Sequence, residues 1–256
     1  MDDMRDLTFW GHKASEYGLR IGSVNVYNAG LRREQAYRVP GRPGDVLPED
    51  APELWPNDIR EYSSALYLHG ASDDTAARSF DRVRQWLLQV GYADLEDSYE
   101  PGIYRRAYLS GDFVPVRKGA GNNFEIPLTF SCDPRRYVVG QQETLLLSAS
   151  SSGTRSPMAP ADFACYPQCY GVLRVEGPAP AFTLLFKDYG EGTVYGSVTF
   201  AASSAGYRFD TETLECSEQN VVTDVSGRLY ITSMSTWLER SATGGAVYLQ
   251  PRWFVR

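Results

Sequence analysis

Phe124-Glu-Ile-Pro-Leu-Thr-Phe-Ser-Cys-Asp-Pro-Arg-Arg-Tyr137 is the stretch that says most about the fold of this chain. Its first part, together with the residue before it (123–132), is typical of a β-strand. Segments of the same kind lie on both sides of it, and apolar and polar residues alternate in most of them with a period of two. Turns that contain Gly and Pro separate them, since Pro lacks the N–H donor of a strand ladder and Gly favours unusual dihedral angles. Together these segments predict a protein built mainly of β-sheet.

One segment, from residue 73 to residue 90, follows a helical period instead. Ser72 is a suitable N-cap, and Gly91 is the expected C-terminal stop. Apolar residues recur within the segment at steps of three and four, which predicts a single amphipathic helix lying on a sheet. The apolar stripe consists of Ala76, Phe80, Val83, Trp86, Leu87 and Val90.

The composition of the chain changes near residue 140. Residues 148–157 are small and polar and show no periodicity, which is typical of a loop or an interdomain stretch. Beyond them the sequence consists of short strands separated by turns, a pattern that indicates a sandwich. We therefore predict an α+β domain over residues 1–140, which includes the strand 61–68, and an all-β domain over residues 141–256.

Charge and hydropathy limit the partners of the protein. Its 256 residues include 25 Lys and Arg against 32 Asp and Glu, a formal net charge of −7. A protein that binds nucleic acid through its phosphates needs an excess of positive charge, so we expect no nucleic-acid binding. No apolar stretch is long enough to cross a bilayer, so we expect no membrane partner. The polar, acidic N-terminus does not resemble a secretory signal, and we expect the chain to fold in a cytoplasm.

The sequence contains few groups that could do chemistry. His12 and His69 are its only histidines, and neither belongs to a metal-ligand or nucleophile–base pattern. A glycosidase would need two opposed carboxyls, but the acidic cluster Asp94, Glu96, Asp97 and Glu100 is expected to be a solvated turn. We expect no enzyme, no metal site and no cofactor.

Four cysteines are too few for a disulfide scaffold. Cys132 and Cys216 are expected to be reduced thiols in strands. Cys165 and Cys169 form a C-x3-C pair for which plain packing, a disulfide and metal binding all stay open.

Several stretches resemble, in the same order and spacing, blocks of the distal tail (Dit) proteins of long-tailed, non-contractile bacteriophages. The stretch 124–137 is the most specific of them and is similar to the strand that closes the N-terminal domain of that family. The others are the opening 9–21, the turn Arg38-Val-Pro-Gly-Arg-Pro-Gly-Asp-Val-Leu47, the block 92–107 after the helix and the ending 247–253.

The resemblance implies a structural role in the virion, at the phage tail tip or baseplate. It implies an N-terminal domain that forms a ring, and a C-terminal galectin-like β-sandwich. Six copies would form a hub that connects the tail tube to the tail-associated lysin or tail fibre and to receptor-binding proteins. The implied partners are a homo-hexamer, the tail tube protein, the tape-measure protein, the lysin or fibre and the receptor-binding proteins, with assembly in the host cytoplasm.

The turn of the second block is a candidate interface because loop tips often carry recognition. Its Gly and Pro residues could equally do no more than shape a hairpin, and both interpretations stay open. The candidate contact residues are Pro40, Gly41, Arg42, Gly44 and Asp45.

Two other functions compete with the tail hub. A stand-alone carbohydrate-binding module that adheres to the host cell wall is favoured by the predicted sandwich and by the 17 Tyr and 5 Trp residues. Trp237 and Trp253 are its candidate sugar-stacking residues. The other is a wall hydrolase, for which the chain offers only its carboxylates.

Overall fold

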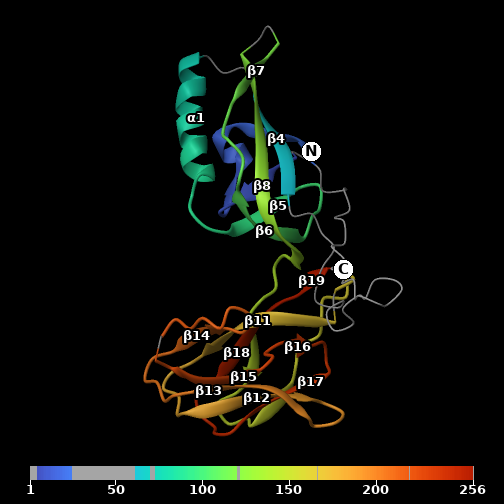
Figure 1. Cartoon of the computed structure of the whole chain (residues 1–256), viewed down its shortest axis with the longest axis vertical. Helices are drawn as coiled ribbons and strands as arrows, with labels where there is room; N and C mark the ends of the chain where they lie inside the picture. The colour runs from blue at the N-terminus through green and yellow to red at the C-terminus, as the bar shows by residue number, and fades with distance from the viewer. Residues whose placement is uncertain are drawn as a thin grey trace, which may run out of the picture. The chain divides into compact units, whose positions relative to one another are not determined.

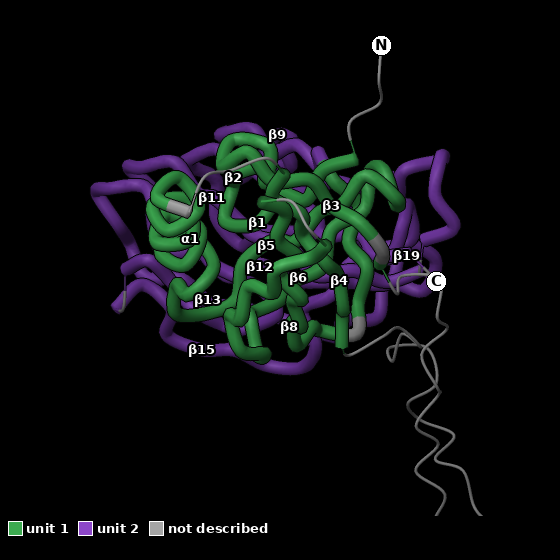
Figure 2. The backbone as a smooth tube through the Cα atoms, turned by 90° about the horizontal axis from the view of Figure 1, so that it is seen from above, with its two compact units in different colours: residues 1–139, 256 green, residues 140–255 purple. Residues whose placement is uncertain are grey.

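The structure is a computed structural model that describes residues 5–24, 61–69, 73–119, 122–165, 167–218 and 220–255. Over these residues the fold is mainly β, with α1 (Asp73–Leu87) as its one α-helix, which confirms the predicted fold class (Figure 1). The chain divides into two compact units (Figure 2). Unit 1 comprises residues 1–139 and Arg256, and unit 2 comprises residues 140–255.

Unit 1 is built on an antiparallel sheet with the strand order β2-β1-β5-β6-β8-β4-β3, and β7 pairs with β8 as well. A short 3-10 helix, η1 (Ala14–Tyr17), follows β2. The strands are β1 (Leu7–Phe9), β2 (His12–Lys13), β3 (Leu19–Val24), β4 (Glu61–Leu68), β5 (Ala93–Asp97), β6 (Ile103–Leu109), β7 (Val116–Lys118) and β8 (Asn123–Val138).

Strand β8 organises this sheet. It pairs with β4 along one side and with both β6 and β7 along the other. The sequence predicts that this strand ends at Cys132, but β8 continues to Val138. Its register with β6 shifts between Arg105 and Ala107, so the ladder is irregular opposite Pro134. A bulge of this kind lets a strand continue past a residue that has no N–H to donate.

Helix α1 packs its apolar stripe on the sheet, and Ala76, Val83, Trp86 and Leu87 are buried there. The prediction that the stripe reaches Val90 is wrong, because α1 ends at Leu87. The side chain of Val90 is 96 % exposed and packs on nothing, so tertiary packing gives the helix no reason to extend to this residue.

The acidic cluster after the helix lies in and just after β5, and the prediction of a solvated turn is wrong. The Asp97 carboxylate is buried and accepts hydrogen bonds from the backbone N–H groups of Tyr99 (2.7 Å) and Glu100 (3.1 Å). Glu100 forms ion pairs with the buried Arg105 at 2.6 Å and with Arg136 at 3.1 Å. These carboxylates hold the β5–β6 connection together, because a buried charge needs a partner.

Unit 2 contains two five-stranded sheets, β10-β17-β12-β13-β15 and β14-β11-β18-β9, with β16 pairing with β11 in the second. Side chains from both sheets form one core, in which Phe200 contacts Phe209 at a centroid distance of 5.5 Å. The strands are β9 (Thr144–Leu147), β10 (Gly153–Arg155), β11 (Gln168–Val175), β12 (Phe182–Asp188), β13 (Val194–Phe200), β14 (Tyr207–Asp210), β15 (Val222–Gly227), β16 (Ile231–Thr232), β17 (Thr236–Arg240) and β18 (Val247–Arg252); β19 (Phe254–Val255) follows.

Candidate assembly and binding surfaces

The five candidate contact residues predicted from the sequence, Pro40, Gly41, Arg42, Gly44 and Asp45, lie outside the described residues. Their role therefore stays a prediction.

The sheet of unit 1 has two edge strands, β2 and β3. Among the described residues, no strand pairs with the outer edge of β2 or of β3. Such edges carry unpaired N–H and C=O groups that a neighbouring chain can use. Side chains of β8 alternate across the sheet, with Leu128 and Phe130 in the core and Thr129 and Ser131 partly exposed on the other side. Tyr108 of β6 lies directly opposite Ser131, so this second face carries aromatic as well as hydroxyl side chains.

Two groups of apolar side chains are exposed on unit 1. The first, which we call the tyrosine cluster, consists of Tyr92 and Tyr108, and the exposed Leu88 and Val90 precede Tyr92 in the chain. Its two tyrosine rings meet edge to face at a centroid distance of 5.1 Å. The second group consists of Val114 and Val116, which lie on the approach to the β7–β8 hairpin and in β7. Exposed apolar groups of this kind mark candidate contacts with other proteins.

Asp133 and Arg135 form a compact ion pair on β8. The Arg135 backbone N–H and Nε both donate to Asp133 Oδ1, at 3.0 and 2.9 Å, and Arg135 Nη2 donates to Oδ2 at 2.7 Å. Burial alone would raise the pKa of the Asp133 carboxyl, but the hydrogen bonds and charge of Arg135 outweigh it and hold the pKa below its ordinary value. The pair thus stabilises the folded form of unit 1 when the carboxyl is ionised.

Asp133→Asn is expected to lower the free energy of unfolding by about 1 kcal/mol at pH 7, because the amide keeps the acceptor but loses the charge. A lowered pKa stabilises the fold above the pKa of the unfolded chain, about 4. The difference between wild type and variant should therefore be full at pH 7 and shrink as the pH falls below about 4. Urea titrations from pH 7 to pH 3 measure it. The exposed Asp112→Asn is the control, and an equal loss in both variants, or a pH-independent one, would contradict the assignment.

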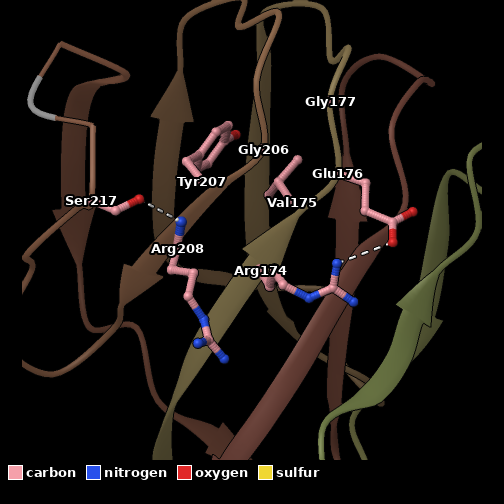
Figure 3. Close-up of a pocket in the computed structure, with 8 residues that line it drawn as sticks. All are labelled: Arg174, Val175, Glu176, Gly177, Gly206, Tyr207, Arg208 and Ser217. Carbon is pink, nitrogen blue, oxygen red and sulfur yellow. Dashed lines mark hydrogen bonds and ion pairs between the residues drawn. The ribbon is translucent and has the colours of Figure 1, made fainter.

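A cavity of about 440 Å³ opens in unit 2 at the paired ends of β11 and β14 (Figure 3). Arg174 and Arg208 lie directly opposite each other on these strands. Glu143 lies between their charges, 2.8 Å from Arg174 Nε and 3.7 Å from Arg208 Nη2, and Glu176 accepts from Arg174 Nη1 at 3.0 Å. The cavity is lined by Arg174, Val175, Glu176, Gly177, Gly206, Tyr207, Arg208 and Ser217.

The charged groups at this cavity neutralise one another. Two cations opposite each other on neighbouring strands repel, and the carboxylates neutralise that repulsion. The Tyr207 hydroxyl is buried and has no hydrogen-bond partner among the described residues; burial raises the pKa of this phenol, so it stays protonated at neutral pH. This arrangement engages both carboxylates in ion pairs at the edge of the sheet.

All four cysteines are free thiols in the structure. Cys169 is fully buried, and burial raises the pKa of its thiol well above the ordinary value. Of the alternatives open for Cys165 and Cys169, the structure contains no disulfide. No group of three or more His, Cys, Asp or Glu residues within the described ranges could hold a metal ion. Over the same part of the chain, no helix has the length and apolar character needed to cross a membrane.

Solved structures of phage proteins share this fold. The Dit protein (gp 19.1) of phage SPP1, described as a paradigm of the hub adsorption apparatus in phages that infect Gram-positive bacteria, aligns with a TM-score of 0.64 and 12 % identity over 96 % of this chain and 98 % of that one. A chain of the phage p2 baseplate in its activated conformation with Sr aligns at 0.52, with 11 % identity over 96 % and 97 % of the two chains. A chain of the same baseplate with Ca aligns at 0.55, with 10 % identity over 97 % of both.

These alignments cover both units, so each unit, over its described residues, has the fold of phage Dit and baseplate proteins. No protein-family model matches the sequence, and no curated protein is similar to it in sequence. The likeness to these solved structures is one of fold, at 10–12 % identity.

Proposed function

We propose that the protein is a structural component of a phage tail tip. In this proposal six copies form a hub ring that connects the tail tube to the tail-associated lysin or fibre and to receptor-binding proteins, within the virion. The observation that carries the proposal is the shared fold with SPP1 Dit over 96 % of this chain and 98 % of that one. Because the match covers both units, this chain and SPP1 Dit share the folds of both units and not only that of a single domain.

We assign ring formation to unit 1 and the galectin-like sandwich to unit 2. A closed ring of more than two copies uses two different surfaces of each subunit, because every subunit contacts one neighbour on each side. Unit 1 has the open edges of β2 and β3, and it also has the tyrosine cluster and the Val114–Val116 pair as separate apolar surfaces. These features supply the two kinds of surface that a ring requires.

The test is the mass and shape of the purified full chain. We expect light scattering to give a mass of six 28.6 kDa chains, and negative-stain microscopy to show six-fold rings. Tyr108→Asp in the tyrosine cluster should reduce the mass to that of smaller species, because it places a charge in a contact. Tyr189→Asp is the matched control, at a tyrosine of unit 2 that is 46 % exposed against 38 % for Tyr108, and it should leave the rings intact.

Two outcomes would overturn this proposal. One is a monomer at every concentration, both alone and with co-expressed tail proteins. The other is a phage that lacks this chain and still builds complete, infectious tail tips.

A further inference from the structure

A row of polar and aromatic side chains crosses the outer face of the sheet β10-β17-β12-β13-β15. Arg155, Trp237 and Lys187 lie in register on three neighbouring strands. Their neighbours along β17 and β12, Leu238 and Phe186, are each 1 % exposed and belong to the core. Because side chains alternate along a strand, the row faces away from the core of unit 2.

Trp237 is seated against the backbone of β10. A Cβ atom at Gly153 would lie 2.7 Å from Cζ2 of the indole, so only a glycine leaves room for the ring there. The Tyr189 ring lies beside it at a centroid distance of 6.0 Å, and this tyrosine is 46 % exposed. The two rings form an aromatic platform at the surface. Trp253, the other tryptophan proposed from the sequence, is 1 % exposed in the core, so its prediction as a sugar-stacking residue is wrong.

Arg155 borders the platform with unused hydrogen-bond donors. Its guanidinium carbon lies 3.4 Å from the centroid of the Tyr189 ring. Within the described part of the chain, this guanidinium has no ion pair and no hydrogen-bond acceptor. The Arg174–Tyr248 pair on the other sheet has a similar stacking distance of 3.9 Å, but Arg174 is bound by two carboxylates. Arg155 therefore keeps its five N–H groups for another molecule.

Glu239, a hydrogen-bond acceptor, and Lys187, a second donor, border the platform along the row. Lys187 Nζ donates to Glu239 Oε2 at 2.8 Å, and the Glu239 side chain is 40 % exposed. The hydrogen bond from Lys187 outweighs desolvation and lowers the pKa of the Glu239 carboxyl, which keeps the acceptor ionised. Further along the same face, the hydroxyls of Thr183 and Thr199 lie 3.0 Å apart.

We propose that this face of unit 2 binds a saccharide. A pyranose ring has an apolar C–H face that fits an aromatic platform, and a rim of hydroxyls that exchange hydrogen bonds with charged groups. The face beyond the platform continues in hydroxyl and charged side chains, which can exchange further hydrogen bonds with the hydroxyls of a saccharide. This site is separate from the ring surfaces of unit 1, so it stands whether or not the hub assembles.

The experiment uses the full chain and defined soluble glycans: dextran, yeast mannan, galactan, chitohexaose and polygalacturonate. Affinity electrophoresis identifies the glycan that binds, and calorimetric titration measures its Kd. Trp237→Ala should weaken that binding by about ten-fold or more, because the stacking surface is lost. Arg155→Ala should weaken it less. Tyr248→Ala, from the Arg–Tyr pair on the other sheet, is the matched control and should bind as the wild type does.

Circular dichroism shows that each variant is folded. Binding that Trp237→Ala weakens and Tyr248→Ala leaves unchanged supports the site. Folded wild-type protein that binds none of the five glycans overturns it, and so does binding that Trp237→Ala does not change. If Trp237→Ala instead lowers the mass of the assembled protein and no glycan binds, the face is a protein contact and the saccharide site is rejected.

Discussion

Arg240→Met is expected to lower the free energy of unfolding of unit 2 by about 4 kcal/mol or more, because it removes all the hydrogen bonds of a buried guanidinium and leaves their carbonyl acceptors without these donors. The Arg240 side chain is 3 % exposed, in the last position of β17, and none of its partners is a carboxylate. Each of its five N–H groups donates to a backbone carbonyl instead. The acceptors are Ser151 (Nε, 2.7 Å), Gly244 and Gly245 (Nη1, both 2.8 Å), Ser148 (Nη2, 2.6 Å) and Ala149 (Nη2, 2.7 Å).

The position of these carbonyls explains the size of the effect. Residues 148–151 connect β9 to β10, and residues 244–245 connect β17 to β18. Both connections cross from one sheet of unit 2 to the other. One guanidinium therefore joins the two crossovers. Its loss should weaken the packing between the two sheets of unit 2 and leave the carbonyl acceptors without donors.

Urea unfolding measures the loss in the free energy of unfolding. Hydrogen exchange of individual peptides shows which part of the chain has lost stability. Peptides from residues 144–252 should lose protection in Arg240→Met, while peptides from residues 61–138 keep theirs. Arg208→Met is the matched control, because the Arg208 side chain is 58 % exposed and makes a single ion pair at 3.7 Å. A loss for Arg240→Met no larger than that of the control would show that water replaces the guanidinium at little cost.

Arg240 also shows why the sequence predicts some elements and misses others. Strand β4 matches its predicted limits, and α1 matches its predicted start, because in both the apolar period agrees with the face that is buried. In β17 an arginine occupies a buried position, which breaks the alternation on which the prediction of a strand depends. Strands β9 and β15 were missed as well. In β15 most side chains are exposed at the edge of the sheet, so it has no apolar period.

The candidate sites show the same limit. Trp237 and Trp253 look equivalent in the sequence, and only the strand register places one on the surface and the other in the core. Asp97 and Glu100 look like a solvated cluster until the Arg105 side chain that pairs with Glu100 is placed beside them. Both cases depend on partners that are far apart in the chain, and local composition carries no information about such partners.

Trp86→Ala is expected to cost unit 1 about 3–5 kcal/mol of its free energy of unfolding, the range for removing a large aromatic side chain from a core. Trp86 is 2 % exposed, and its Nε1 donates to the Phe9 carbonyl at 2.6 Å, which joins α1 to β1. Its ring stacks on Tyr17 of η1 at a centroid distance of 4.8 Å. One side chain thus connects three elements of unit 1.

Trp86→Phe separates the two contributions of this side chain. It keeps an aromatic ring in the core but leaves the Phe9 carbonyl without its donor, so we expect a loss of about 1–2 kcal/mol, between the wild type and Trp86→Ala. Gln85→Ala, at an exposed position of α1, should change stability by less than about 0.5 kcal/mol. Urea unfolding should be monitored by circular dichroism and not by tryptophan fluorescence, because the variants remove the tryptophan that would give the fluorescence signal. Equal losses for Trp86→Phe and Trp86→Ala would mean that the hydrogen bond to β1, rather than the burial of the ring, holds the helix on the sheet.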